Sequence, residues 1–171
     1  MELDEVYRVY VKDLYRYLFS LSKDHHAAED LVQEAFYRAY IQLADEEISN
    51  IKAWLFKVAY HAFIDSTRKS KRLVITDKVG EVQESASMPI SSPEKSILEK
   101  ESFQLLLQDI DSLKEEEKHV ILLCDLHKMS NQDAAAILGM KINTLKSHLY
   151  RGRKRIIARV KERRNLYEGQ G

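Results

Sequence analysis

The chain has 171 residues, of which 44% are hydrophobic and 32% charged, with 5 Gly and 2 Pro. This composition is typical of a helix-rich globular protein with room for one ordinary domain or two small ones. The single cysteine excludes an internal disulfide, the N-terminus lacks the apolar run of a signal peptide, and no run approaches the ~20 apolar residues of a membrane-spanning helix. We therefore expect a cytoplasmic protein.

Charge is distributed unevenly along the chain. Lys plus Arg and Asp plus Glu both total 27, so the net charge is zero. Residues 51–72 carry 6 basic and 1 acidic groups, and residues 141–171 carry 10 basic and 2 acidic ones. Residues 1–50, in contrast, carry 11 acidic and 5 basic groups. A polyanion would be drawn to the two basic segments, and a basic partner to the acidic ones.

Apolar residues at three- and four-residue steps predict three amphipathic helices within residues 1–72. The second should span about 25–43 after an N-cap at Asp24, and the third about 51–72. The apolar positions are Tyr7, Tyr10, Leu14, Leu18 and Leu21 in the first helix, Ala28, Leu31, Val32, Ala35, Phe36, Ala39 and Leu43 in the second, and Leu55, Val58, Ala59 and Ala62 in the third. With no strand-like alternation, the fold class is all-α, beginning with a small helical bundle over 1–72.

A second helical domain is expected over residues 97–168, after a linker. Residues 73–96 are rich in Ser, Glu and Gln and hold both prolines, which is typical of a flexible linker. Beyond it, two helices precede a helix-turn-helix. Their apolar positions are Ile97, Leu105, Leu106 and Ile110, and then Val120, Ile121, Leu123, Cys124 and Leu126.

The segment 131–155 has the features of a helix-turn-helix that binds duplex DNA. Ser130 or Asn131 can cap the first helix, and Gly139 permits the left-handed turn that ends it. Small residues at Ala134 and Ala135 allow a second helix to cross closely. That helix opens at Asn143 or Thr144, with Leu145, Leu149 and Ile156 facing inward. Its predicted DNA-binding residues are Asn143, Thr144, Lys146, Ser147 and His148 in the first turns, which enter a major groove, and Arg151, Arg153, Lys154 and Arg155, which supply charge to phosphates. The plainer interpretation is a helical hairpin with a solvated basic end.

Three motifs, in order, resemble bacterial RNA polymerase sigma factors of the extracytoplasmic-function (ECF) type. They are Ala28-Glu-Asp-Leu-Val-Gln-Glu-Ala-Phe36, Trp54-Leu-Phe-Lys-Val-Ala-Tyr-His-Ala-Phe-Ile-Asp-Ser-Thr-Arg68, and the segment 131–155. The resemblance implies a transcription initiation factor that joins core RNA polymerase, finds the minus-ten and minus-thirty-five promoter elements, and assists melting. It also implies control by an anti-sigma factor, often one held at the membrane.

The resemblance assigns roles to the first domain. Asp30, Gln33 and Glu34 would dock on the polymerase, although each also fits a plain solvated face. The residues assigned to the minus-ten element and the melted strand are Lys52, Trp54, Lys57, Tyr60, His61, Arg68 and Lys69. An aromatic ring among cations suits base stacking, yet Trp54 could equally belong to the core, and Asp65 could pair with Arg68. The family usually has Asn where His61 stands.

No catalytic constellation or cofactor motif is present. His119, Cys124 and His127 have a spacing that suggests zinc, but a fourth ligand is missing and Cys124 lies in an apolar helix, so we expect neither a metal nor a cofactor. Two rivals to the sigma-factor interpretation remain. One is a stand-alone helix-turn-helix regulator that binds a two-fold operator, and the other is an interaction adaptor with an incidental basic tail.

Overall fold

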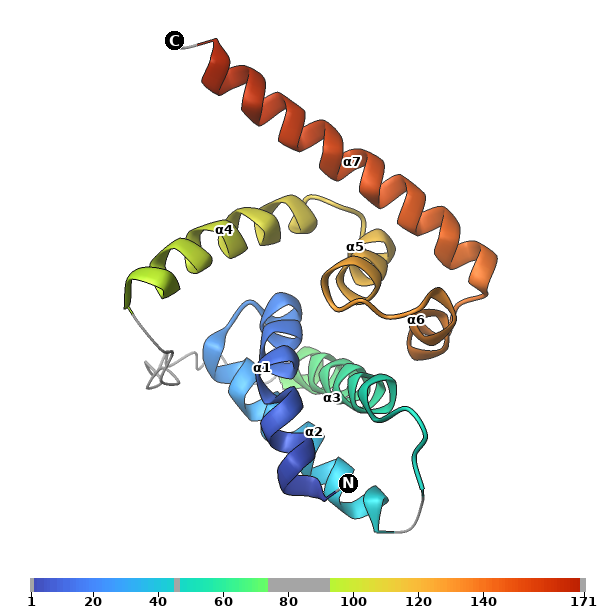
Figure 1. Ribbon diagram of the computed structural model, residues 1–171. Coiled ribbons are helices and arrows are strands. Elements are labelled where there is room, and N and C mark those ends of the chain that lie inside the picture. Colours follow the sequence, from blue (N-terminus) through green and yellow to red (C-terminus); the bar gives the residue numbers. More distant parts are fainter. Residues whose placement is uncertain (1, 45–46, 74–92, 170–171) are drawn as a thin grey trace. The chain divides into compact units, whose positions relative to one another are not determined.

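The computed structural model describes residues 2–44, 47–73 and 93–169; for residues 73 and 93–100 it describes the backbone alone (Figure 1). The chain divides into two compact units, Met1–Met88 and Pro89–Gly171. The elements in the described ranges are helical and include no strand, which confirms the predicted all-α class. No helix in these ranges is both long and apolar enough to cross a membrane. Residues 74–92, most of the predicted linker, lie outside the described part; residue 73 ends one helix, and 93–96 begin another.

The first unit is a bundle of three mutually packed helices: α1 (Leu3–Ser22), α2 (His25–Leu43) and α3 (Ile51–Leu73). The Asp24 side chain accepts a hydrogen bond from the backbone N–H of His26 at 3.1 Å, so the predicted cap is confirmed. Lys23, with φ 59°, makes the tight reversal between α1 and α2. These local features fix where α2 begins and therefore which of its residues face outward.

The core of the first unit matches the prediction for α2 and α3 better than for α1. All the predicted apolar residues of α2 and α3 are buried except Leu43, which is half-buried. On α1, however, Val6 and Tyr17 are fully buried, whereas Tyr7 is exposed. The ring of Tyr17 packs on Phe56 with centroids 5.0 Å apart, so α3 supplies the contact that makes this tyrosine a core residue.

The second unit contains α4 (Pro93–Asp111), α5 (Glu115–Ile121), α6 (Asn131–Leu138) and α7 (Ile142–Glu168). The predicted inner face of α4 is confirmed at Ile110, which is buried, but is wrong at Leu105, which is 44% exposed, because Leu107 faces the core instead. Between α5 and α6 the chain forms a π-helical turn, Leu122–Leu126, where an uninterrupted helix was predicted. We call this segment the π-turn.

The helix-turn-helix is present and comprises α6 and α7. Ser130 caps α6, its hydroxyl accepting from the N–H of Asp133 at 3.0 Å, and Gly139 ends it with φ 67°. Ala134 and Ala135 are buried, and so are Leu145 and Leu149 on α7, while Ile156 is half-buried. Helix α7 begins at residue 142, one or two residues earlier than predicted.

Gly152, which no motif in the sequence indicated, sets the distance between α5 and α7. Gly152 is buried, and a Cβ atom there would lie 2.9 Å from Ile121 Cγ1 and 3.5 Å from Glu117 Cβ. The two helices therefore lie so close that a larger residue at position 152 would force the Ile121 side chain to move. This contact holds α7 against the rest of its unit with a defined face outward.

Candidate functional site

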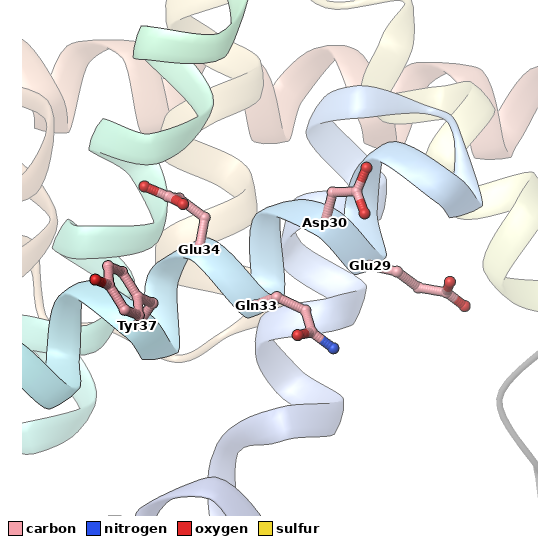
Figure 2. A pocket seen from close by; sticks show the side chains of 5 residues that line it. All are labelled: Glu29, Asp30, Gln33, Glu34 and Tyr37. Atoms are coloured by element: carbon pink, nitrogen blue, oxygen red, sulfur yellow. The ribbon is translucent and has the colours of Figure 1, made fainter.

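An open, acidic depression lies on the outer face of α2. Figure 2 shows its five lining residues, Glu29, Asp30, Gln33, Glu34 and Tyr37, and we call it the acidic hollow. The three residues predicted to bind the polymerase, Asp30, Gln33 and Glu34, are all exposed and lie together here. Their spacing places them opposite the buried stripe of α2, so the same pattern that packs this helix also presents them.

Two residues of the acidic hollow were missed. Glu29 and Tyr37 each lie four residues from Gln33, which places them on neighbouring positions of the same helical face. Tyr37 is 63% exposed, so its ring presents an apolar surface to solvent beside the carboxylates of the acidic hollow. The four-residue spacing from Gln33 could have identified both.

The acidic hollow is linked to α3 by one arginine. Arg38 donates its Nε–H to Glu34 Oε1 at 3.0 Å and an Nη1–H to Asp65 Oδ2 at 3.1 Å. The pairing of Asp65 with Arg68, which the sequence left open, is therefore replaced by a pairing with Arg38 from α2. Asp30 in turn has its Oδ2 3.8 Å from Nε2 of His26. Two carboxylates of the acidic hollow thus already face cationic or ionisable groups of the chain itself.

On α3, three of the predicted DNA-binding residues form one exposed row. Lys57, His61 and Arg68 recur at four- and seven-residue intervals and point away from the core. Trp54 is half-buried, at the flank of this row, so its ring is neither a full core residue nor fully in solvent. Tyr60 and Lys52 are also half-buried and Lys69 is exposed, and by helical spacing these three lie off the row. The residues predicted to contact the minus-ten element therefore fall into two groups: the exposed row with Trp54 at its flank, and three residues that lie off the row.

The outer face of α7 brings together Asn143, Ser147, Arg151 and Lys154, all of them exposed. Thr144 and Lys146 are exposed at its two sides, and the half-buried His148 has its Nδ1 3.4 Å from an Nη of Arg151. Tyr150 was missed although it is 67% exposed on this face, with the Lys154 ammonium 5.9 Å from its ring centroid. Because the major groove of DNA admits an α-helix, an aromatic ring beside a cation on such a helix can contact both bases and phosphates.

Four other arginines of α7 pair with carboxylates of the same unit although most of them are exposed. Arg153 forms a bidentate pair with Asp125 of the π-turn, at 2.9 and 2.6 Å. Arg155 lies 3.6 Å from the buried Glu117, and Arg159 and Arg163 both bond to the buried Asp109 of α4. The prediction that Arg153 contacts DNA thus meets a competing interaction within the unit, because its guanidinium fork is already occupied by a carboxylate.

The histidines and cysteine of the zinc-like spacing do not converge. His119 Nε2 lies 3.3 Å from Glu115 Oε1, and Cys124 Sγ lies 3.8 Å from Asn131 Oδ1. Burial lowers the pKa of His119 and raises the pKa of the Cys124 thiol. Within the described residues, no three His, Cys, Asp or Glu side chains are grouped so as to hold a metal ion.

Comparison with known proteins agrees with this layout. The sigma-70 region 2 family matches residues 6–73, and the sigma-70 region 4 family matches residues 103–156. The ECF RNA polymerase sigma factor SigM of Bacillus subtilis is 37% identical over 160 residues, covering 92% of this chain and 94% of its own. The chain belongs to the ECF RNA polymerase sigma factors. This sigma factor accordingly directs RNA polymerase to specific promoters and is not itself an enzyme.

Two solved structures resemble this sigma factor. The sigma factor RpoE of Bartonella quintana, in complex with the anti-sigma factor NepR, has a TM-score of 0.72 at 29% identity, covering 92% of this chain and 96% of its own. CnrH, solved with the cytosolic domain of CnrY, has a TM-score of 0.66 at 19% identity, covering 94% and 88%, and supports the fold alone.

Proposed function

We propose that this sigma factor divides its task among three surfaces. The acidic hollow of α2 docks on core RNA polymerase, the exposed row of α3 reads the minus-ten element and assists melting, and the outer face of α7 reads the minus-thirty-five element. The observation that carries the proposal is the separation of charge. Exposed carboxylates gather on α2, and exposed cations on α3 and α7. Surfaces of opposite sign in one chain suit a protein that must hold a basic partner and DNA together.

Docking would rest on complementary charge with an aromatic contact beside it. Asp30 and Glu34 supply the negative charge, Gln33 supplies a donor and an acceptor, and Tyr37 offers a flat apolar surface. A basic helix of the polymerase would fit such a surface. Because these side chains are solvent-exposed, the attraction should steer association and weaken as salt is added.

At the minus-ten element, Lys57 and Arg68 would hold the phosphate backbone while Trp54 and His61 meet unpaired bases. A half-buried ring suits this role, because its inner edge is fixed by packing and its outer part can stack. Lys52, Tyr60 and Lys69 lie off the row and would contact a strand that curves around the helix.

At the minus-thirty-five element, the first turns of α7 would enter the major groove. Asn143, Ser147 and Tyr150 lie toward base edges, and Arg151 and Lys154 toward phosphates or guanine. Arg153, held by Asp125, would orient the π-turn against α7 and leave phosphate contact to Lys146, Arg151 and Lys154.

We further propose control by an anti-sigma factor, of the membrane-held kind that the sequence resemblance implies. Support comes from the similarity to RpoE, which was solved bound to NepR. Such a partner would block promoter binding by covering the acidic hollow or the basic faces.

Run-off transcription with purified core polymerase on promoter templates tests the proposal. We expect promoter-dependent transcripts only when this sigma factor is added. Arg151→Ala should reduce binding to the minus-thirty-five element while core assembly stays intact, and Glu34→Lys should reduce core assembly. Glu5→Lys, an equal charge change at an exposed position of α1, is the matched control and should leave assembly unchanged.

No added transcript, together with tight binding of the free protein to a two-fold operator, would show a stand-alone regulator instead. Weak DNA binding without sequence preference, and no core assembly, would show an interaction adaptor.

A further inference from the structure

Arg38 occupies a position between two surfaces to which the proposed function gives different tasks. Its side chain is 33% exposed, and its guanidinium bonds simultaneously to Glu34 of the acidic hollow and Asp65 of α3. Asp65 is the one acidic residue among residues 51–72, and it lies four residues after His61 and three before Arg68. Arg38 thus joins the docking face to the helix that carries the minus-ten row.

The two carboxylates compete for one guanidinium. A planar fork can bond one carboxylate with two parallel N–H groups, or two carboxylates with one or two N–H groups each, as here. Burial acts to lower the pKa of Arg38, but the hydrogen bonds that Arg38 donates to Glu34 and Asp65 outweigh it and raise the pKa. Because Glu34 and Asp65 each accept from a different N–H group of the same guanidinium, loss of either carboxylate leaves Arg38 to the other.

We propose that Arg38 is a positioning residue that couples polymerase docking to the charge of α3. The proposal rests on the docking role of the acidic hollow. When a cation of the polymerase takes Glu34, the guanidinium, which already donates one N–H group to Asp65, turns fully to Asp65 and neutralises it more completely. Helix α3 then presents its cations to phosphates without an opposing carboxylate in the same turn. The free protein, in which Arg38 is shared, holds α3 in a less attractive state for DNA.

The same linkage predicts an effect in the opposite direction. In Asp65→Asn, Arg38 loses one carboxylate and binds Glu34 alone, so a polymerase cation must displace a stronger internal partner. The affinity for core polymerase should fall by about two- to fivefold, the range expected of an exposed ion pair. This is notable because Asp65 lies on a different helix from the acidic hollow.

A double-mutant cycle with core-polymerase binding as the readout tests the coupling. Kd is measured for the full-length protein, Asp65→Asn, Arg38→Met and the double variant, where methionine keeps the packing of the arginine stem. We expect Asp65→Asn to weaken binding in the natural background and to change nothing in the Arg38→Met background. An equal weakening in both backgrounds would overturn the coupling, because the effect would then be long-range charge alone.

A second measurement uses the free protein and needs no polymerase. In Asp65→Asn, hydrogen exchange at the Arg38 Nε–H should slow, because its bond to Glu34 strengthens. Faster exchange would mean that Asp65 merely supports Arg38, and would also overturn the coupling. If Glu34→Gln leaves core affinity unchanged, it is the docking role of the acidic hollow that fails.

Discussion

The two basic segments of the chain differ in what their cations contact. In residues 141–171, four of ten basic residues are arginines that form ion pairs with carboxylates of the same unit: Arg153, Arg155, Arg159 and Arg163. In residues 51–72 the single carboxylate, Asp65, bonds to Arg38 from another helix, and the row of Lys57, His61 and Arg68 faces outward. Residues 141–171, which carry more basic groups, therefore use a larger fraction of them in ion pairs within their own unit.

The difference follows from the residues against which each of the two helices packs. Helix α3 lies in a three-helix bundle whose core is almost entirely apolar, so its cations stay at the surface. Helix α7 runs along α5 and α4, where Asp109 and Glu117 are buried, and buried carboxylates require cationic partners. Net charge by segment is thus a poor measure of how many phosphates a helix can hold.

The largest expected effect comes from the close approach of α5 and α7. Gly152→Val should lower the free energy of unfolding of the second unit by about 1–3 kcal/mol, because the new side chain collides with Ile121. Urea unfolding followed by circular dichroism measures it. Ser147→Val places the same residue on the exposed face of α7 and is the control. Equal losses in both variants would contradict the packing argument.

The next effect concerns α3. Trp54→Ala should impair open-complex formation more than closed-complex binding, with a loss of about 1–3 kcal/mol if the ring stacks on an unpaired base. Permanganate footprinting of the melted strand, beside binding to duplex promoter, separates the two stages. An equal loss at both stages would assign the ring to the core of the bundle.

A smaller effect is expected in the salt dependence of promoter binding, where the neighbouring residues Lys154 and Arg153 of α7 should differ. Lys154→Ala should reduce the slope of log K against log salt by about 0.9, the value for one phosphate contact. Arg153→Ala should leave that slope unchanged and instead lower stability, since its partner is Asp125. The measurement is promoter binding by the holoenzyme between low and moderate salt. A reduced slope in Arg153→Ala would restore the original prediction that this arginine contacts DNA.

The smallest effect is a pH dependence confined to the second unit. Burial lowers the pKa of His119 below its ordinary value of 6.5, so the unfolded chain takes up this proton at a higher pH than the folded one. The stability contributed by His119 is therefore present above pH 6.5 and is lost as the pH falls through the folded pKa. His119→Gln should flatten the fall in stability below pH 6.5. An unchanged profile would show that His119 is not its source.

Local signals in the sequence were sufficient for much of the architecture. Asp24, Ser130 and Gly139 act through hydrogen bonds and backbone conformation within a few residues, so their roles at helix ends could be predicted without tertiary information. The apolar stripes of α2 and α3 were likewise correct. The resemblance to ECF sigma factors, carried by three motifs in order, gave the family that the comparisons confirm.

What could not be predicted depends on contacts between distant residues. Arg153 meets Asp125 across 28 positions, so its basic character alone suggested a DNA contact. Arg163 likewise meets Asp109 across 54 positions, a pairing that no local pattern indicates. Leu105 and Leu107 are the same residue type, and only the packing of α4 against its neighbours decides that Leu107 is buried and Leu105 is exposed. Glu29 and Tyr37 were missed for a different reason: the resemblance gives roles only to Asp30, Gln33 and Glu34, although Glu29 lies within the same motif and Tyr37 directly follows it.

We propose that promoter recognition is divided between the exposed row of α3 and the outer face of α7, each binding DNA weakly alone, and that the polymerase holds the two together. The most direct test compares the affinity of the free protein and of its holoenzyme for the same promoter duplex, at the same salt concentration. We predict that the free protein binds weakly and with little preference over scrambled DNA, and that the holoenzyme binds tightly and selectively. Equal affinity and selectivity in the two forms would contradict the claim.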